Sequence, residues 1–399
     1  MSASRTRPRI VGIGQTAFGR GLPDTPSALA IDASLAAIAD AGVEVGDIDG
    51  VCRFTSPFES VAIPDIVRGL GLTELSFFAE SPLGGEALGA VVAHAAHAIG
   101  AGQARNVLVY RSLSQSRLGR FGRADEGPGA HGGATAAEDV VVGEAGNNSF
   151  SWPYGLLSPG NLFALTVNRY RHEFGVPADR LAEAMGTVAV QQRAYANRNP
   201  RAIMRDRPLT MEQYLASRVI SSPLRLFDLC LENDGAVAFV LSASGDRTAT
   251  GRRGVAVLSA TQSLSPYSEP MGIYTEDPLE PFPSAVRDRL YGRAGLTPED
   301  VDVAELYDAT SFMTLRGLET YGFVPHGSGW RHLLEQGVGP DAPLPVNTHG
   351  GHLSEGYLHG MNALLEGVRQ LRGESVNQIR AAEIALVGAP SGSAVLLGV

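Results

Sequence analysis

AGVEVGDIDG, the stretch Ala41–Gly50, returns near the other end of the chain as AGLTPEDVDV, the stretch Ala294–Val303. The two stretches match at the Ala, at the Gly and at both Asp positions, and they pair Val with Leu and Ile with Val. Each leads into an apolar segment that predicts a strand, Val51–Phe54 in the first case and Ala304–Tyr307 in the second. A repeat with so long a period indicates two duplicated domains and not a solenoid.

A second pair of segments repeats the same order of elements. Near the amino end, a predicted helix of small residues, Leu83–Ile99, precedes a predicted strand, Asn106–Tyr110. Near the carboxyl end, Gly350-Gly351 precedes a predicted helix, Ser354–Leu371, and a predicted strand, Glu383–Val387. Because strands and helices alternate in both regions, each half is predicted to be an α/β unit.

We therefore expect an amino-terminal half, residues 1–250, and a carboxyl-terminal half, residues 251–399. Residues 112–160 are rich in Gly, Ser, Arg and Asp and lack a sustained period, so they are predicted to form a loop insertion in the amino-terminal half. The other elements predicted in that half are a strand at Arg9–Gly14, a helix from its N-cap Ser27 to Ala41, helices at Leu162–Glu173 and Arg180–Asn197, a turn at Glu232–Gly235 and a strand at Ala236–Leu241.

The composition excludes several classes of function. Of the 399 residues, 44% are hydrophobic and 19% are charged, which supplies a large core and argues against a disordered chain. The formal net charge of −10 argues against nucleic-acid binding through a basic surface. Lysine is absent, so all 32 basic residues are Arg. Schiff-base aldolases, pyridoxal-phosphate enzymes and Walker-type phosphate loops need a Lys amine and are therefore excluded.

Cys52 and Cys230 are the two cysteines of the chain. They cannot form a disulfide framework or a four-Cys zinc site, and neither opens a helix that would stabilise a thiolate, so both are predicted to be buried structural residues. The amino end has no apolar run of signal-peptide length, and the longest apolar stretch, Ala87–Gly102, is too short to cross a membrane. We expect a cytoplasmic protein without membrane contact.

Gly12-Ile-Gly14-Gln-Thr-Ala17 follows the first predicted strand and has the GxGxxA form of a dinucleotide-binding turn. Such a site needs a helix that begins inside the motif, so that its amino end meets the pyrophosphate. Here several Gly and Pro residues delay the next predicted helix to Ser27. The favoured interpretation is therefore a Gly-rich end of a strand.

His349, His352 and His359 lie close together in the sequence. Three imidazoles could hold a metal ion for a metal-dependent lyase or hydrolase. The first two flank a Gly-Gly turn, however, and only Glu355 supplies an acidic ligand at suitable spacing. We expect no metal, and a metal-dependent lyase stays as an alternative.

Ser222–Leu241, Leu306–Phe312 and Asn347–Gly360 carry motifs that resemble those of the thiolase superfamily. Within it, the chain most resembles the sterol-carrier-protein-thiolase-like lipid-transfer branch and, there, the steroid side-chain aldolases of actinobacteria. The resemblance extends over essentially the whole chain. It implies an α/β thiolase fold, in which two duplicated βαβ-rich halves form a layered αβαβα sandwich.

The chain departs from working thiolases at each position that carries their covalent chemistry. Leu83 stands where the resemblance places the nucleophilic Cys, and Gly356–Leu358 reads GYL in place of Gly-His-Pro. Tyr307–Thr310 reads YDAT in place of His-Asp-Cys-Phe, and Leu386–Gly392 lacks the last thiolase Cys. Acyl transfer through a thioester on the enzyme is therefore chemically unavailable.

The resemblance to the aldolases implies that Tyr307 and Tyr357 are the catalytic residues. The aldolases of this branch have Leu-Tyr-Asp and Gly/Ala-Tyr-x-His-Gly at these two places, which this chain matches with Leu306–Asp308 and Gly356–Gly360. The two tyrosines are expected to face one pocket, one from each half. Supporting or oxyanion roles are expected for Asp308, Asn347, His349, Gly350, Gly351, His359 and Gly388, with the Leu83–Gly84 turn as a second oxyanion candidate.

The activity that the resemblance implies is retro-aldol cleavage of a β-hydroxyacyl-CoA thioester. The substrate would be a 17-hydroxy steroid with a three-carbon CoA side chain, and the products a 17-ketosteroid and propionyl-CoA. Cleavage needs a base for the hydroxyl proton, stabilisation of the enolate and an acid for the α-carbon. A phenol has an ordinary pKa of about 10, so it serves only if neighbouring donors lower that pKa or if it is part of a proton relay.

The resemblance also implies a homodimer and a small partner subunit of the DUF35 type, built from a zinc ribbon and an OB-fold. Arg117, Arg120 and Arg123 could contact CoA phosphates or this partner. No cofactor is expected, because the CoA is part of the substrate. The alternative from another class is a non-catalytic acyl-CoA-binding scaffold subunit that works with a DUF35 partner. The lost thiolase cysteines fit that alternative, whereas the paired tyrosines argue against it.

Overall fold

A single mixed sheet runs through the molecule in the computed structural model, which describes residues 7–55, 61–81, 87–115, 152–156, 158–243, 250–263 and 284–399. The sheet has nine strands in the order β3-β2-β4-β7-β1-β8-β11-β10-β9. These strands are β1 Arg9–Gln15, β2 Gly50–Phe54, β3 Phe77–Ser81, β4 Asn106–Ser114, β7 Asp234–Ser242, β8 Val255–Thr261, β9 Val303–Leu306, β10 Ile384–Gly388 and β11 Ala394–Gly398. A separate two-stranded ribbon pairs β5, Val219–Ser221, with β6, Leu224–Arg225.

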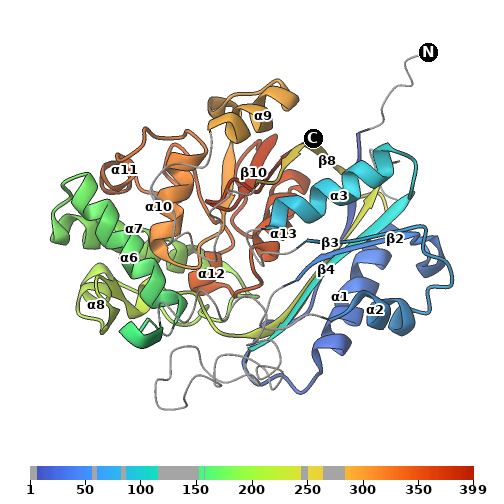
Figure 1. Cartoon of the computed structure of the whole chain (residues 1–399), viewed down its shortest axis with the longest axis horizontal. Helices are drawn as coiled ribbons and strands as arrows, with labels where there is room; N and C mark the ends of the chain where they lie inside the picture. The colour runs from blue at the N-terminus through green and yellow to red at the C-terminus, as the bar shows by residue number, and fades with distance from the viewer. Residues whose placement is uncertain are drawn as a thin grey trace.

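Helices cover both faces of the sheet and also lie inside the molecule (Figure 1). They are α1 Pro26–Ala41, α2 Ile63–Leu70, α3 Leu88–Gly100, α6 Pro159–Glu173, α7 Ala178–Arg198, α8 Met211–Leu215, α9 Ser284–Ala294, α10 Ser311–Thr320, α11 Gly329–Glu335, α12 Gly351–Ser354 and α13 Met361–Arg372. None of the helices in the described ranges is both long and apolar enough to span a bilayer.

The two parts of the sheet have the same topology, which confirms the predicted duplication. In the amino-terminal part the order β1-β7-β4-β2 contains two antiparallel pairings and then a parallel one. In the carboxyl-terminal part the order β8-β11-β10-β9 contains the same three pairings in the same senses. The parts join where β1 pairs with β8, Arg9 opposite Ala256 and Ile10 opposite Val255. The boundary at residues 250 and 251 stays a prediction.

The repeated ten-residue stretches occupy equivalent places, and their shared Asp residues make equivalent bonds. The second Asp of the first stretch, Asp49, accepts from the main-chain N–H of Asn106 at 2.9 Å, where β4 begins. Its counterpart Asp302 accepts from the main-chain N–H of Ile384 at 2.9 Å, where β10 begins. Asp49 thus fixes the start of β4, which is parallel to β2, the strand that follows Asp49. Asp302 likewise fixes the start of β10, which is parallel to β9, the strand that follows Asp302. This requirement explains why both copies keep the Asp.

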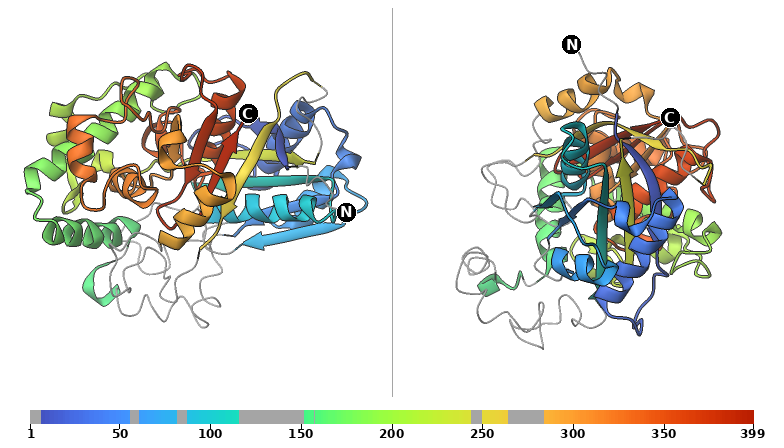
Figure 2. Two further views of the ribbon diagram at one scale, coloured as in Figure 1. Left: turned by 90° about the horizontal axis from the view of Figure 1, so that it is seen from above. Right: turned by 90° about the vertical axis from the view of Figure 1, so that its right-hand side faces the viewer.

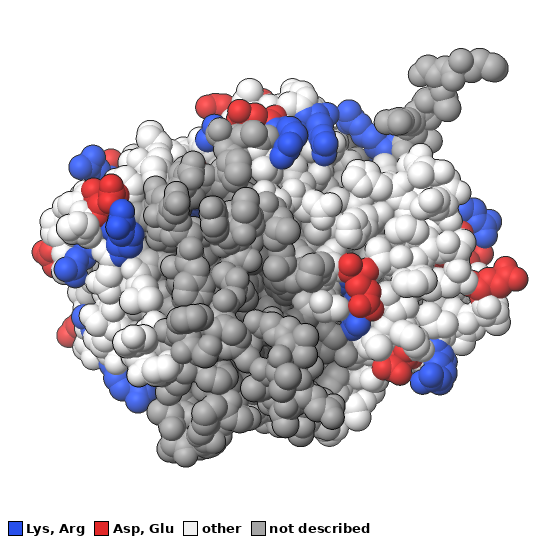
Figure 3. Space-filling view, in the orientation of Figure 1, with Lys and Arg blue, Asp and Glu red and all other residues white. Residues whose placement is uncertain are grey.

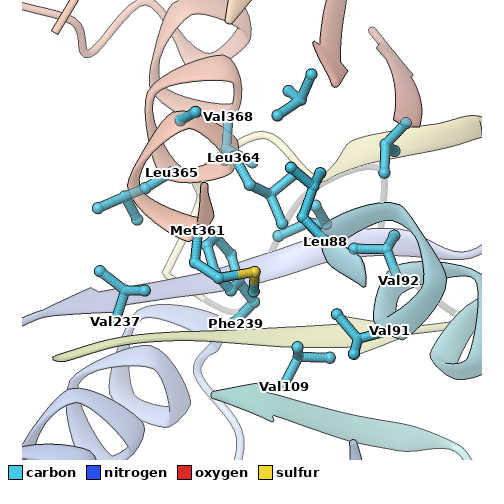
Figure 4. Packing of buried hydrophobic residues seen from close by; sticks show 14 of the residues in the cluster. Leu88, Val91, Val92, Val109, Val237, Phe239, Met361, Leu364, Leu365 and Val368 are labelled. Atoms are coloured by element: carbon cyan, nitrogen blue, oxygen red, sulfur yellow. The ribbon is translucent and has the colours of Figure 1, made fainter. Parts of the chain in front are cut away.

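Side chains alternate between the two faces of each strand, and this alternation creates five layers. On β4, Val109 points into a cluster with α3 and α13, whereas Tyr110 points to the opposite face, against α1. On β10, Val387 points into the same central cluster, whereas Leu386 packs with the helices of the outer face. The central cluster contains the apolar sides of α3 and α13 (Figure 4). The layers are therefore α1 and α2, the first half-sheet, α3 and α13, the second half-sheet, and α9, α10 and α7 (Figure 2). This confirms the predicted αβαβα sandwich.

Close packing against α1 explains the glycines of the GxGxxA motif. A Cβ on Gly12 would lie 2.1 Å from the main-chain oxygen of Ala37, and one on Gly14 would lie 2.0 Å from that of Ala33. The helix therefore rests directly on β1, and it begins only at Pro26, well beyond the motif. This is the Gly-rich strand that we favoured over a nucleotide-binding turn.

Several predicted boundaries were wrong. The helix predicted at Ser354–Leu371 begins only at Met361, as α13, because the backbone between it and α12 carries positive φ at His359 and Gly360. The first long helix takes its N-cap bond from Thr25 and not from Ser27. The turn predicted at Glu232–Gly235 ends earlier, since β7 already begins at Asp234.

The predicted insertion is described only at its ends. There β4 continues to Ser114 and α6 begins at Pro159, and the loop between them stays a prediction. Arg117, Arg120 and Arg123 lie outside the described residues. On the face shown in Figure 3, the described charged side chains form small groups of both signs, most of them near the edge.

Candidate active site

The candidate site lies at the carboxyl ends of β9 and β10, where the chain leaves the second half-sheet. These two strands are parallel and pair Leu306 with Gly388. Tyr307 follows directly on β9, and its main-chain N–H donates to the carbonyl of Gly388 at 2.8 Å. This bond extends the ladder by one step and fixes the direction in which the Tyr307 side chain leaves the sheet.

Tyr357 lies in the break between α12 and α13, and a residue of the other half holds it there. Its main-chain N–H donates to Asn233 Oδ1 at 2.6 Å, and Asn233 Nδ2 donates to its carbonyl at 3.4 Å. The N–H of Asn233 donates in turn to Gln115 Oε1 at 3.1 Å. The buried amide of Asn233 thus replaces the helical hydrogen bonds that this break lacks.

The structure brings the two predicted tyrosines into direct contact. The hydroxyls of Tyr307 and Tyr357 lie 2.7 Å apart, and the two side chains are buried. The expectation that one tyrosine comes from each half is wrong, because both belong to residues 251–399. The amino-terminal half contributes Asn233, which holds Tyr357, and Arg111, which contacts His359 beside Tyr357.

The environment opposes a free tyrosinate. Burial raises the pKa of Tyr357 well above its usual value, and the neighbouring Tyr307 and Cys230 raise it further. The guanidinium of Arg111 acts in the opposite direction. The Tyr357 hydroxyl is therefore protonated at rest, and its short distance from the Tyr307 hydroxyl suits transfer of a proton from one to the other.

Asp308 and His352 form a buried pair beside the tyrosines. The Asp308 carboxylate accepts from the His352 main-chain N–H, at 3.0 and 3.1 Å to its two oxygens, and from His352 Nδ1. The other ring nitrogen, Nε2, accepts from the N–H of Gly360 at 3.0 Å. The ring centroid lies 5.2 Å from that of Tyr307 and 5.5 Å from that of Tyr357. The imidazole of His352, on α12, therefore links Asp308, which follows Tyr307, to Gly360, which precedes α13.

His359 lies against Tyr357. Their ring centroids are 4.7 Å apart with the planes tilted by 54°. The Nδ1 atom of His359 lies 2.9 Å from Arg111 Nη2. Burial lowers the pKa of His359 well below its usual value, and the charge of Arg111 lowers it further.

His349 belongs to a separate, fully buried acidic cluster. Its Nδ1 lies 2.9 Å from Glu305 Oε2, and its Nε2 lies 3.9 Å from Glu355 Oε2. Burial lowers the pKa of His349, but Glu355 and Glu305 outweigh that effect and raise the pKa to about 9. Burial raises the pKa of Glu305 to about 7, against the opposing effect of His349. The pair ties the turn that carries His349 to β9, which carries Glu305.

Asn347 and the two glycines after it shape the turn that leads into α12. Asn347 Oδ1 accepts from the main-chain N–H of Leu306 at 2.6 Å, and its φ of 54° is left-handed. Gly351 also has a positive φ, of 65°, and a Cβ there would lie 2.4 Å from Asp308 Oδ2. Gly350 has a φ of 112° and faces α7. These residues act on the backbone beside the tyrosines and not on the tyrosine hydroxyls.

The two candidates for an oxyanion amide remain predictions. The carbonyl of Gly388 accepts from Tyr307, and a Cβ on Gly388 would lie 2.5 Å from the ring of Tyr321, so glycine is required there for packing. The Leu83–Gly84 turn lies outside the described residues.

The cysteines do not act as thiolates in this environment. Cys52 is buried in β2, and burial raises its pKa to about 12. Cys230 is partly exposed beside Asp308 and Tyr357, and burial of its sulfur again raises the pKa above the usual value. The prediction of structural burial is therefore confirmed for Cys52, whereas Cys230 is only partly buried.

The three histidines that lie close together in the sequence engage different partners. His349 pairs with Glu305, His352 with Asp308 and the Gly360 N–H, and His359 with Arg111. Within the described ranges, no group of three His, Cys, Asp or Glu residues is placed to hold a metal ion. A metal-dependent lyase built on these rings therefore has no support in their arrangement.

Sequence reasoning missed three residues that the structure places around the tyrosine pair, and a fourth that pairs with His349. The first three are Arg111 and Asn233 from the amino-terminal half and His352 from the carboxyl-terminal half, and the fourth is Glu305. His352 entered the sequence argument only as a metal ligand. The Asn-Asp-Gly sequence at the start of β7 was a signal that Asn233 has a special backbone environment, but no pattern pointed to Tyr357 as its partner.

The chain is similar to several known proteins. Residues 280–395 match the family described as "Thiolase C-terminal domain-like". The chain is 37% identical to the 17-hydroxy-3-oxo-4-pregnene-20-carboxyl-CoA lyase of Mycobacterium tuberculosis, over 98% of each chain. It is 35% identical to a steroid side-chain-cleaving aldolase of Thermomonospora curvata, over 92% of this chain and 91% of the relative. The solved structure of an Ltp2–ChsH2(DUF35) aldolase superposes with a TM-score of 0.84 and 33% identity, covering 100% of this chain and 99% of that one.

Proposed function

This chain belongs to the steroid side-chain-cleaving aldolases, carbon–carbon lyases with the thiolase fold, and we propose that it cleaves a 17-hydroxy steroid CoA thioester through Tyr307 and Tyr357. The observation that carries the proposal is the 2.7 Å contact between the two hydroxyls. A phenol pair at this distance can accept a proton at one end and deliver one at the other.

The reaction takes up no net proton and releases none, because the substrate loses the proton of its 17-hydroxyl and gains one at its α-carbon. A relay that passes protons between these two positions therefore suffices. One tyrosine accepts the proton of the 17-hydroxyl while it gives its own proton to the other tyrosine, and the second tyrosine delivers a proton to the α-carbon. The bond between the α-carbon and C17 breaks, its electron pair forms the enolate of the thioester, and C17 becomes a ketone. Because the pKa of Tyr357 is raised, a concerted transfer avoids the free tyrosinate that the site disfavours.

The substrate proposal follows from the relatives and from the chemistry that remains available. The chain has no lysine for an imine and no cysteine at the sites where thiolases form an acyl-enzyme. A thioester acidifies its own α-carbon, so two phenols suffice to move the protons. We propose that no cofactor is needed beyond the CoA of the substrate, and that the products are a 17-ketosteroid and propionyl-CoA.

We further propose a homodimer and a partner subunit of the DUF35 type. One of the related solved structures is a complex with a DUF35 protein, which supports the partner. The edge strand β3 supports the dimer, because its outer edge is unpaired among the described strands and its Phe78 is 68% exposed. Pairing of β3 with a second copy would cover both features. A cytoplasmic location stays a prediction.

The experiment is to incubate the chain, alone and with a DUF35 partner, with 17-hydroxy-3-oxo-4-pregnene-20-carboxyl-CoA. Mass spectrometry would follow propionyl-CoA and the 17-ketosteroid, and the double variant Tyr307→Phe/Tyr357→Phe would serve as the inactive control. Equal amounts of the two products are expected from the unmodified chain. Binding of the thioester without product in either condition would favour the scaffold alternative.

A further inference from the structure

Arg111 is a buried cation beside the tyrosine relay, and the relay itself does not use it. It lies on β4 with 2% of its surface exposed, and its Nη2 is 2.9 Å from His359 Nδ1. A guanidinium has only donors. His359 Nδ1 must therefore be the acceptor, and the single ring proton of a neutral His359 must be on Nε2.

The surroundings hold this imidazole in place. His359 has a left-handed φ of 53° in the break between α12 and α13. Its ring lies against Tyr357, and its edge meets Phe54 with centroids 6.1 Å apart. The Arg111 guanidinium also lies over the Phe54 ring, 5.0 Å from its centroid. Phe54 thus orients both the cation and the imidazole.

The Nε2–H of His359 has no acceptor among the described residues. The only hydrogen bond that the ring makes there is the one to Arg111 through Nδ1. The side chain is 7% exposed, and its ring contacts Tyr357, one of the two residues of the relay. A fixed N–H donor beside the reacting groups, with a permanent positive charge behind it, suits a developing oxyanion.

We propose that His359 is a catalytic residue whose Nε2–H donates to the thioester oxygen as it becomes the enolate, and that Arg111 is the positioning residue that fixes this tautomer. The inference rests on the proposed function. No bond to the imidazole breaks: the tyrosines move the proton, and the electron pair of the broken carbon–carbon bond moves onto the thioester oxygen. A neutral imidazole can polarise a carbonyl in this way without exchanging a proton with the substrate.

The test uses the assembled enzyme with the variants His359→Phe, Arg111→Met and Arg111→Lys, and with His172→Phe as the matched control on an exposed histidine. His359→Phe is expected to lower kcat by about 10²–10³-fold, as loss of one oxyanion donor does. KM should change little, because the donor acts mainly on the transition state. Arg111→Met should lower kcat less, Arg111→Lys should restore part of the loss, and His172→Phe should have no effect.

Nitrogen-15 NMR of histidine-labelled protein reports the tautomer directly. We expect a His359 signal with the proton on Nε2 in the unmodified enzyme, lost or mixed with the other tautomer in Arg111→Met and restored in Arg111→Lys. A kcat close to that of the unmodified enzyme in folded His359→Phe, or a proton on Nδ1, would overturn the inference. An unmodified enzyme that releases no propionyl-CoA would instead contradict the proposed function, and the tautomer would still be read from the spectrum.

Discussion

The hydroxyls of Tyr307 and Tyr357 lie 2.7 Å apart, although 50 residues separate them in the chain. Tyr307 is fixed by the end of β9 and Tyr357 by Asn233 of the other half. The contact therefore depends on the way the two halves pack. It joins one residue positioned by a regular strand to one positioned by a buried amide.

Removal of either hydroxyl should interrupt the proton relay. We expect Tyr307→Phe and Tyr357→Phe each to lower kcat by about 10²–10⁴-fold, the usual contribution of general acid–base catalysis. The double variant should be scarcely slower than either single one, since both hydroxyls belong to one relay. Steady-state release of propionyl-CoA measures the effect.

Tyr154→Phe is the matched control, because Tyr154 is 83% exposed. It should be fully active. Near-normal turnover in both Tyr307→Phe and Tyr357→Phe would remove the tyrosines from the mechanism.

Asn233 should act on catalysis through the position of Tyr357. Asn233→Ala leaves the Tyr357 N–H without its buried acceptor, which is expected to cost about 1–3 kcal/mol of unfolding free energy. The same change frees the segment that carries Tyr357, so kcat should fall while KM changes less. Urea unfolding and steady-state kinetics measure the two effects.

Asn168→Ala is a suitable comparison, because Asn168 is exposed and its amide bonds only to the carbonyls of Ala164 and Ser222. It should alter stability slightly and kcat not at all. If Asn233→Ala kept full kcat in a folded protein, Asn233 would be a structural residue only.

The duplication could be predicted from sequence because each copy of the repeat performs a local task. Asp49 and Asp302 bind the starts of neighbouring strands, and this requirement leaves a short, recognisable pattern. The tyrosines could be predicted because they replace residues of a known motif. Both signals are carried by residues that are close together in the chain.

The surroundings of the tyrosines could not be predicted, because their partners are distant in the chain. Arg111 and His359 are 248 residues apart, and Asn233 and Tyr357 are 124 residues apart. A charged residue inside a strand and an Asn in a turn have ordinary local explanations, so nothing in either pattern points to the partner. The break after α12 was missed although Gly356 and Gly360 disfavour a helix interior, because nothing local to the sequence fixes the start of α13 at Met361.

Because β1 and α1 are in close contact, a single methyl group added to β1 is expected to lower the unfolding free energy strongly. Gly14→Ala would place a Cβ 2.0 Å from the carbonyl oxygen of Ala33, so the helix must move away from the sheet. We expect a loss of about 1–3 kcal/mol or more in unfolding free energy, as for other overpacked cores. Gly46→Ala is the control, because a Cβ there meets nothing within 4 Å and its φ is not left-handed. Equal unfolding midpoints for the two variants would contradict this account.

The buried pair of His349 and Glu305 predicts that the protein loses stability in mild alkali. The pKa of His349 is raised from its usual 6.5 to about 9, so its contribution to folding is complete below pH 6.5 and is lost as the pH rises through 9. The pKa of Glu305 is raised from 4.5 to about 7, so Glu305 also lowers the unfolding free energy as the pH rises, but it does so between about pH 4.5 and 7. Between pH 7 and 9, the unfolding free energy should therefore fall as His349 releases its proton, by at most about 1.4 kcal/mol per pH unit for that proton.

Urea unfolding at several pH values between 7 and 9.5 measures this slope. His349→Gln should flatten it, because an amide does not titrate, whereas His172→Gln, on an exposed histidine, should leave it unchanged. The slope of the unmodified protein is informative even if His349→Gln folds poorly. A free energy that stays level or rises over this range would show that His349 is neutral in the folded protein, and that the Glu305 contact is an ordinary hydrogen bond instead of an ion pair.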